Sequence, residues 1–201
     1  MTPDEFKTAL LTIPVPDIVS AHITNSDPGP FVLAEHLEFV ATKIRTAFAI
    51  NAEHSVQPIV VGSAKLGFSF TEKNYPVFKP RYRSYVAGES DIDMAICSPA
   101  LYGMLWKGIA HYGAAQDTFP WRTESLGDYM LHGWIRPDKI PVPPPPGCQA
   151  WFDLMSTLNS SEFFRFKKLR CGIYQSKFFL ELYQRRGLVE LKNIEMLKAK
   201  L

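Results

Sequence analysis

The segment from Ser90 to Cys97 alternates between two kinds of side chain, and this restricts the fold more than any other feature of the chain. Its positions 92, 94 and 96 are Ile, Met and Ile, whereas two of the intervening positions are Asp91 and Asp93. Successive side chains of an extended backbone point to opposite faces. The segment therefore predicts a strand with one buried face and one face that carries two carboxylates.

Apolar periodicity elsewhere predicts the elements around this strand. Residues recurring every three to four positions indicate an amphipathic helix over 31–50, and the β-branched run at 58–61 indicates a buried strand. The expected order is helices at 3–13, 16–23 and 31–50, strands at 58–61 and 90–97, helices at 98–112 and 150–164, a strand at 169–174, a helix at 176–186 that stops at Gly187, and a last helix.

This order predicts an α+β sandwich in which helices flank a small mixed sheet. A chain of 201 residues suits one domain with a sizeable core. We expect its parts to be N-terminal helices (1–56), a core that carries the motifs (57–112), an irregular proline-rich insert (113–149) and a mainly helical C-terminal part (150–201).

The composition excludes several classes of protein. Hydrophobic residues make up 46% of the chain and charged residues 21%, as in soluble globular proteins. Three scattered cysteines, Cys97, Cys148 and Cys171, form neither a disulfide framework nor a zinc motif. No signal peptide and no apolar run of membrane-spanning length is recognised, and the net charge of +2 alone does not indicate a nucleic-acid binder. We expect a cytoplasmic protein without a membrane partner.

A glycine-serine pair follows the strand at 58–61. Gly62 leaves room where a phosphate would approach the backbone, and Ser63 adds a hydroxyl donor. A helical turn through 64–66 would direct amide groups at an anion, and Lys65 would add a positive charge. Gly62, Ser63 and Lys65 are therefore the candidate nucleotide-binding residues.

Asp91 and Asp93 are the candidate metal ligands and catalytic carboxylates. On a strand their backbones are about 7 Å apart, on the same face. Two such charges repel each other unless a divalent cation binds both, and Mg²⁺ favours carboxylate oxygens together with phosphates and water. Phosphoryl transfer uses this arrangement because its transition state is stabilised by positioning and by charge neutralisation. Magnesium, or manganese in its place, is the expected cofactor.

Taken in order, Val61-Gly62-Ser63, Gly67-Phe68-Ser69 and the run 90–96 resemble the DNA polymerase β superfamily of nucleotidyltransferases. The resemblance covers residues 58–112. It implies a mixed sheet flanked by helices, a nucleoside triphosphate substrate, and transfer of a nucleotidyl group to a hydroxyl of a protein, an RNA or a small molecule. By this likeness, Gly62 and Ser63 hold the triphosphate, and Asp91 and Asp93 hold the metal ions.

The chain departs from the family pattern in two places. The spacer between the motifs is more than twice the usual length, so residues 69–89 are interpreted as an inserted loop. The family also supplies a third carboxylate from a later strand, but the strand at 169–174 carries basic residues instead. Asp153, Glu190 or no third acid are the alternatives, and Asp153 is the candidate for a third catalytic residue.

Each motif also has a plain structural interpretation. Gly62-Ser63 also fits an ordinary turn that ends a strand, and the two aspartates also fit a solvated edge strand. The basic residues at 165, 167, 168 and 170 are interpreted as a solvated face. The alternative function is a catalytically silent protein of the same fold that binds a nucleotide or a partner.

Overall fold

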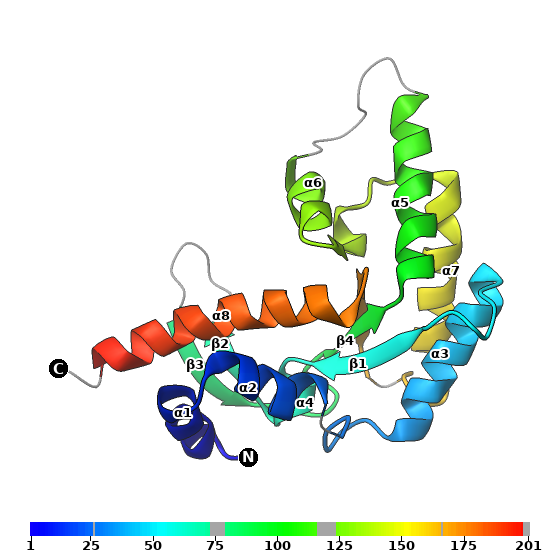
Figure 1. The fold of residues 1–201 in the computed structure, drawn as a ribbon. Helices are drawn as coiled ribbons and strands as arrows, with labels where there is room; N and C mark the ends of the chain where they lie inside the picture. The colour runs from blue at the N-terminus through cyan, green and yellow to red at the C-terminus, as the bar shows by residue number, and fades with distance from the viewer. Residues whose placement is uncertain (26, 73–78, 116–123, 166, 199–201) are drawn as a thin grey trace.

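A sheet in which the strand with the aspartates lies inside, between two neighbours, organises the protein (Figure 1). The computed structural model describes residues 1–25, 27–72, 79–115, 124–165 and 167–198. The elements are α1 (Pro3–Thr12), α2 (Val15–Val19), a π-helical turn η1 (Ser20–Thr24), α3 (Ala34–Phe48), β1 (Gln57–Val61), α4 (Ser63–Leu66), β2 (Phe68–Glu72), β3 (Lys79–Ser84), β4 (Ile92–Cys97), α5 (Pro99–Ala114), α6 (Glu124–Leu131), β5 (Trp134–Ile135), a 3-10 turn η2 (Pro137–Lys139), α7 (Pro146–Ser160), β6 (Leu169–Tyr174) and α8 (Lys177–Lys198).

The main sheet is mixed and has the strand order β1-β4-β6-β5 in the described residues. β1 runs antiparallel to β4, β6 runs parallel to β4, and β5 runs antiparallel to β6. The α+β class, with a small mixed sheet flanked by helices, is confirmed.

The two faces of the sheet pack against different helices. Ile92, Met94 and Ile96 belong to the larger core, which α3, α5 and α7 cover. Ala95 and Cys97 lie on the other face, with Leu180 of α8. The alternation of β4 therefore separates the two cores as the sequence predicts, and the face that carries the aspartates is the face on which α8 packs.

The predicted inserted loop at 69–89 is wrong in its main part. β2 and β3 form a two-stranded antiparallel sheet, and residues 73–78 lie outside the described part of the chain. Phe68 and Phe70 place their rings 5.6 and 5.7 Å from the ring of Phe6 on α1. The hairpin thus forms because α1 covers its apolar side, a partner that the local sequence does not reveal.

The C-terminal part also differs from expectation. The helix expected to stop at Gly187 continues as α8 to Lys198. A glycine inside a helix costs about 1 kcal/mol, but Leu188 and Leu191 directly after it are fully buried against α1 and α2. That burial outweighs the local preference.

The insert at 113–149 contains more regular structure than expected. It holds α6 and β5, and Trp134 and Ile135 pair with Tyr174 and Ile173 of β6; residues 116–123 lie outside the described part. A two-residue strand shows no periodicity, so only its pairing identifies it. The helix expected at 150–164 begins earlier, at Pro146, which suits a first helical turn.

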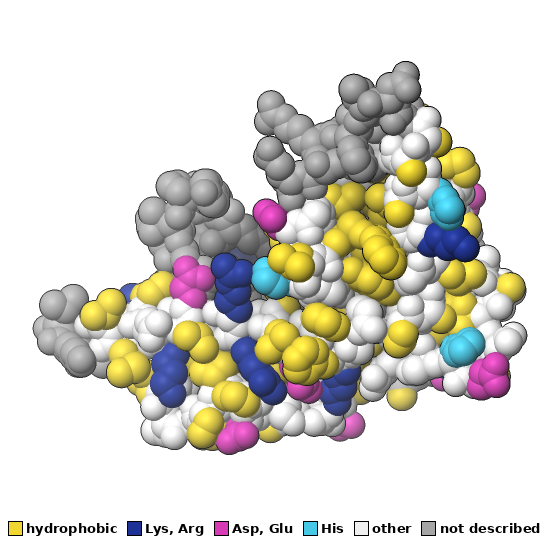
Figure 2. Space-filling view, turned by 45° about the horizontal axis from the view of Figure 1, so that its top comes forward, with side chains coloured by type: hydrophobic (Ala, Val, Ile, Leu, Met, Phe, Trp, Pro, Cys, Tyr) yellow, Lys and Arg dark blue, Asp and Glu magenta, His cyan; other side chains and the backbone are white. Residues whose placement is uncertain are grey.

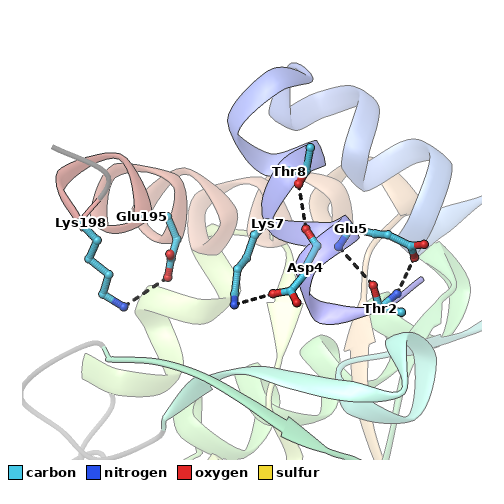
Figure 3. Close-up of polar contacts among 7 residues, drawn as sticks. All are labelled: Thr2, Asp4, Glu5, Lys7, Thr8, Glu195 and Lys198. Carbon is cyan, nitrogen blue, oxygen red and sulfur yellow. Dashed lines mark hydrogen bonds and ion pairs between the residues drawn. The ribbon is translucent and has the colours of Figure 1, made fainter. Parts of the chain in front are cut away.

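Side chains cap the starts of two helices, and the serine cap at residue 98 is the one that the sequence predicts. Ser98 Oγ accepts a hydrogen bond from the Leu101 amide at 3.3 Å and begins α5. At α1, Thr2 Oγ1 accepts from the Glu5 amide at 3.2 Å, and Glu5 Oε2 accepts from the Thr2 amide at 2.7 Å (Figure 3). This reciprocal pair fixes the start of the helix that covers the hairpin.

Within the described residues, no helix combines the length and the apolar character that a bilayer crossing requires.

Gly133→Ala is expected to lower the free energy of unfolding by about 3 kcal/mol. Gly133 has a φ of 64°, and an added Cβ would lie 2.4 Å from the ring of Phe179 on α8. Urea unfolding monitored by circular dichroism measures the change. Gly127→Ala is the control, because an added Cβ on α6 meets nothing within 4 Å and its φ is not positive. An equal loss in both variants would contradict the argument.

Candidate active site

Asp91 and Asp93 stand on one face of the sheet, at the start of β4. Asp93 is the second residue of β4 and pairs with Val61 on one side and with Arg170 on the other. Asp91 directly precedes the strand, and its side chain reaches Arg170. Because Ile92 is buried on the opposite face, Asp93 lies on the side that packs against α8. Asp91, just before the strand, reaches the same side through Arg170, and its charge also contributes to the raised pKa of Tyr85 in the larger core.

The Gly62 turn lies against Asp93. Gly62 has φ 67° and ψ −147°, a region open essentially only to glycine. A Cβ at this position would lie 3.2 Å from Asp93 Oδ2. The end of β1 and the carboxylate of β4 therefore meet closely, and glycine is needed there for both its conformation and its lack of a side chain.

Ser63 begins the short helix α4, as the sequence predicts. The amides of Lys65 and Leu66 both donate to the Gly62 carbonyl, at 3.2 and 3.3 Å. These two N–H groups are used within the turn and are not donors for an anion. Ser63 itself is half-buried beside Gly62, and its contact with a phosphate stays a prediction.

Lys65 makes a contact that the sequence does not predict. Its side chain is only 7% exposed, and its ammonium donates to the carbonyl oxygen of Asp27. Burial lowers the pKa of Lys65, and the charge of Asp27 partly offsets this effect. Together with His22, these residues line an open pocket of about 440 Å³. This contact directs Lys65 to the loop before α3.

Two basic residues beside Asp91 belong to the site, although the sequence does not assign them to it. Arg170 Nε lies 2.9 Å from Asp91 Oδ2, and Lys168 Nζ lies 3.7 Å from Asp91 Oδ1. The Asp91 side chain is 22% exposed, so its charge is partly withdrawn from water and balanced by both cations. The interpretation of these residues as a solvated face holds, since the Lys168 and Arg170 side chains are 67% and 52% exposed, but both also pair with Asp91. The sequence does not show these ion pairs, because they depend on the parallel pairing of β6 with β4.

The third carboxylate does not come from the expected candidates. Asp153 is exposed on α7, which packs on the opposite face of the sheet, and its Oδ1 accepts from Gln149 at 2.8 Å. Glu190 is exposed on α8. In the part of the chain that the structure describes, no group of three or more His, Cys, Asp or Glu side chains lies close enough together to hold a metal ion.

Tyr174 of β6 and Tyr183 of α8 lie on the same face. Burial raises the pKa of the Tyr174 and Tyr183 hydroxyls, and the charge of Asp93 contributes to the rise in both. Tyr183 therefore lies within electrostatic range of Asp93. The sequence predicts that Tyr183 lies on a helix. It does not predict this contact, because the pattern of residues does not show which strand a helix packs against.

The donor set fits one divalent cation. Carboxylate oxygens such as those of Asp91 and Asp93 are the protein ligands that Mg²⁺ or Mn²⁺ uses when substrate and water complete its coordination. The ion pairs of Asp91 with Arg170 and Lys168 are the alternative way to offset the same charge. A dication at this site has to compete with them.

Comparisons of the chain with protein-family models, with curated proteins and with solved structures find no match.

The double variant Gly62→Ala/Asp93→Ala is expected to be more stable than the sum of the two single changes predicts. A methyl group added at position 62 would lie 3.2 Å from Asp93 Oδ2, a tight contact, and removal of that carboxylate relieves the crowding. A coupling free energy of about 1 kcal/mol is expected from urea unfolding of the four proteins. Gly67→Ala is the control partner, since Gly67 also has positive φ (85°) but open space around it; coupling of equal size there would refute the contact.

Proposed function

We propose that this protein is a magnesium-dependent nucleotidyltransferase. It transfers a nucleotidyl group from a nucleoside triphosphate to a hydroxyl of a protein, an RNA or a small molecule. The observation that carries the proposal is the contact between the Gly62 turn and Asp93, with Asp91 on the same face. That contact joins the two halves of the motif, which lie about thirty residues apart in the sequence.

The reaction exchanges one phosphorus–oxygen bond for another. The acceptor oxygen attacks the α-phosphorus, the bond from the α-phosphorus to the bridging oxygen breaks, pyrophosphate leaves, and the hydroxyl proton passes to water. Asp91 and Asp93 would hold Mg²⁺, or Mn²⁺ in its place, which supplies charge neutralisation for the phosphates. Gly62 and Ser63 would accommodate the triphosphate against the backbone.

Arg170 and Lys168 would serve the same reaction from β6 and the residue before it. In the present arrangement both neutralise Asp91. When a cation occupies the carboxylates, the two basic side chains remain beside the site and are free to contact phosphate oxygens. Arginine is well suited to this exchange because its planar donor group binds carboxylates and phosphates alike.

Asp91→Asn and Asp93→Asn are each expected to reduce nucleotidyl transfer at least about a hundredfold, a loss comparable to removal of other groups that stabilise transition-state charge. Each change removes a negative charge from the metal site and leaves the shape of the side chain almost unaltered. Transfer is measured as label incorporated from each of the four α-labelled nucleoside triphosphates, with Mg²⁺ and cell extract as the source of acceptors.

Asp153→Asn is the matched control, because this carboxylate lies on the helix that covers the opposite face. It is expected to retain full transfer. The proposal would be overturned if the Asp91→Asn and Asp93→Asn variants both incorporated as much label as the unmodified protein. It would also be overturned by the absence of labelling with all four nucleotides.

A catalytically silent protein that binds nucleotides is the second candidate. The ion pairs that already balance Asp91, together with the lack of a third metal-ligating side chain in the described residues, favour it. Such a protein would use Arg170, Lys168 and the Gly62 turn to bind phosphates without transfer.

Calorimetric titration with a non-hydrolysable triphosphate separates the two candidates. The enzyme is expected to require Mg²⁺ for tight binding, and Asp93→Asn should weaken that binding about tenfold or more, since a metal that bridges protein and phosphates is lost. The silent protein is expected to bind equally well with Mg²⁺ and with EDTA. Its Asp93→Asn variant would bind the anion more tightly, because one repelling charge is removed.

A further inference from the structure

Four aromatic rings from four different elements meet beside the candidate site. The Trp134 indole of β5 stacks on Tyr174 of β6, with ring centroids 5.4 Å apart and planes 7° apart. Tyr183 of α8 lies 4.4 Å from the indole, and Tyr129 of α6 lies 4.9 Å from it, edge-on. We call these four residues the aromatic cluster. Tyr129 and Tyr183 stand more than fifty positions apart in the sequence, so only the tertiary fold assembles it.

Cationic side chains accompany the cluster. The guanidinium of Arg136 lies 4.9 Å from the Tyr129 ring centre and 5.4 Å from that of Trp134. Arg136 is held in turn by both carboxylate oxygens of Asp138, at 3.0 and 2.7 Å. Arg186 on α8 lies near enough to lower the pKa of the Tyr183 hydroxyl, against the larger upward effect of burial. Positive charge therefore accompanies the rings from two elements.

Two glycines permit this close arrangement. A Cβ on Gly172 would lie 2.6 Å from Trp134 Nε1, so the indole rests directly on the backbone of β6. A Cβ on Gly133 would meet the Phe179 ring at 2.4 Å, so α8 also approaches without a gap. The position of the cluster is consequently set by backbone contact, which leaves its rings little freedom to move.

The aromatic cluster lies on the same sheet face as the aspartates. Asp93 pairs with Arg170 in β6, and Gly172 is two residues further along that strand. Strand spacing and rise place the Cα atoms of Asp93 and Gly172 roughly 8 Å apart. The charge of Asp93 reaches the hydroxyls of Tyr174 and Tyr183.

Tyr183 is the member of the cluster that is open to solvent. It is 44% exposed, while Tyr174 is buried, so one part of its ring is covered by Trp134 and the remainder is accessible. A partly exposed ring offers a face on which a base can stack. Figure 2 shows one face of the molecule, on which Lys and Arg side chains (dark blue) lie among hydrophobic ones (yellow).

We propose that Tyr183, held in place by the rest of the aromatic cluster, is the platform on which the base of the nucleoside triphosphate stacks. The inference rests on the proposed function, since it takes the phosphates to lie at Asp91, Asp93 and the Gly62 turn. A stacked ring accepts any of the four bases, because every base has a π-face. The cluster is therefore expected to make the protein bind a nucleotide more tightly than a polyphosphate without a base. It is expected to discriminate little among the four bases.

Tyr183→Ala is the deciding variant, and two ligands are titrated into it by calorimetry with Mg²⁺. The first ligand is a non-hydrolysable nucleoside triphosphate, tried with each base, and the second is inorganic tripolyphosphate, which has the charges without the base. Removal of one stacking ring is expected to raise the dissociation constant for the nucleotide about tenfold. The dissociation constant for tripolyphosphate is expected to stay within about twofold, because the ring makes no contact with phosphates.

Two further variants complete the test. Tyr183→Phe keeps the ring and is expected to bind the nucleotide like the unmodified protein. Leu182→Ala is the matched control, since Leu182 neighbours Tyr183 on α8 and is 43% exposed but lies outside the cluster, so it should change neither constant. Unchanged tripolyphosphate binding also shows that the Tyr183→Ala protein is folded.

The outcomes separate this inference from the function on which it rests. If the unmodified protein binds nucleotide and tripolyphosphate but Tyr183→Ala binds both unchanged, the stacking platform is wrong and the phosphate site stands. If Tyr183→Ala weakens both ligands equally, Tyr183 supports the phosphate site instead, and the platform is again wrong. If the unmodified protein binds neither ligand, the proposed function and this inference fail together.

Discussion

The pairing of β4 with β1 and β6 is the constraint on which the rest of the structure depends. The register of β1 brings Val61 opposite Asp93, so the Gly62 turn ends beside a carboxylate. The register of β6 brings Arg170 opposite Asp93, so its guanidinium reaches the neighbouring Asp91. A shift of β6 by one residue would turn Arg170 to the opposite face and bury its charge in the core of α3, α5 and α7, and a shift of β1 would remove the Gly62 turn from Asp93.

The site can be understood as a balance of charges on a half-covered face. Two carboxylates next to a packed sheet are costly unless a positive charge accompanies them. Arg170 and Lys168 supply that charge in this structure, and a dication would supply it in the proposed enzyme. The same basic residues would neutralise the aspartates without a substrate and contact phosphates with one. In the proposed enzyme, this dual use would account for acidic and basic groups that lie so close together.

Helix α8 links the two halves of the molecule. Its first half packs Leu180 on the sheet beside Ala95 and Cys97, and its second half packs Leu188 and Leu191 on α1 and α2. Those helices in turn cover the hairpin of β2 and β3. The same helix carries Tyr183 within electrostatic range of Asp93. Packing of the N-terminal helices therefore contributes indirectly to the position of a side chain at the candidate site.

The sequence by itself determined the local features: the alternation of β4, the glycine turn with its helical start, the cap of α5 and the same-face placement of Asp91 and Asp93. Each depends on neighbours within a few residues along the chain, where backbone geometry alone decides. The tertiary structure decided the hairpin at β2 and β3, the continuation of α8 through Gly187, the ion pairs of Asp91 and the aromatic cluster. Those features depend on partners brought from distant segments, and the free energy of burying apolar surface against them exceeds the local preferences that the sequence displays.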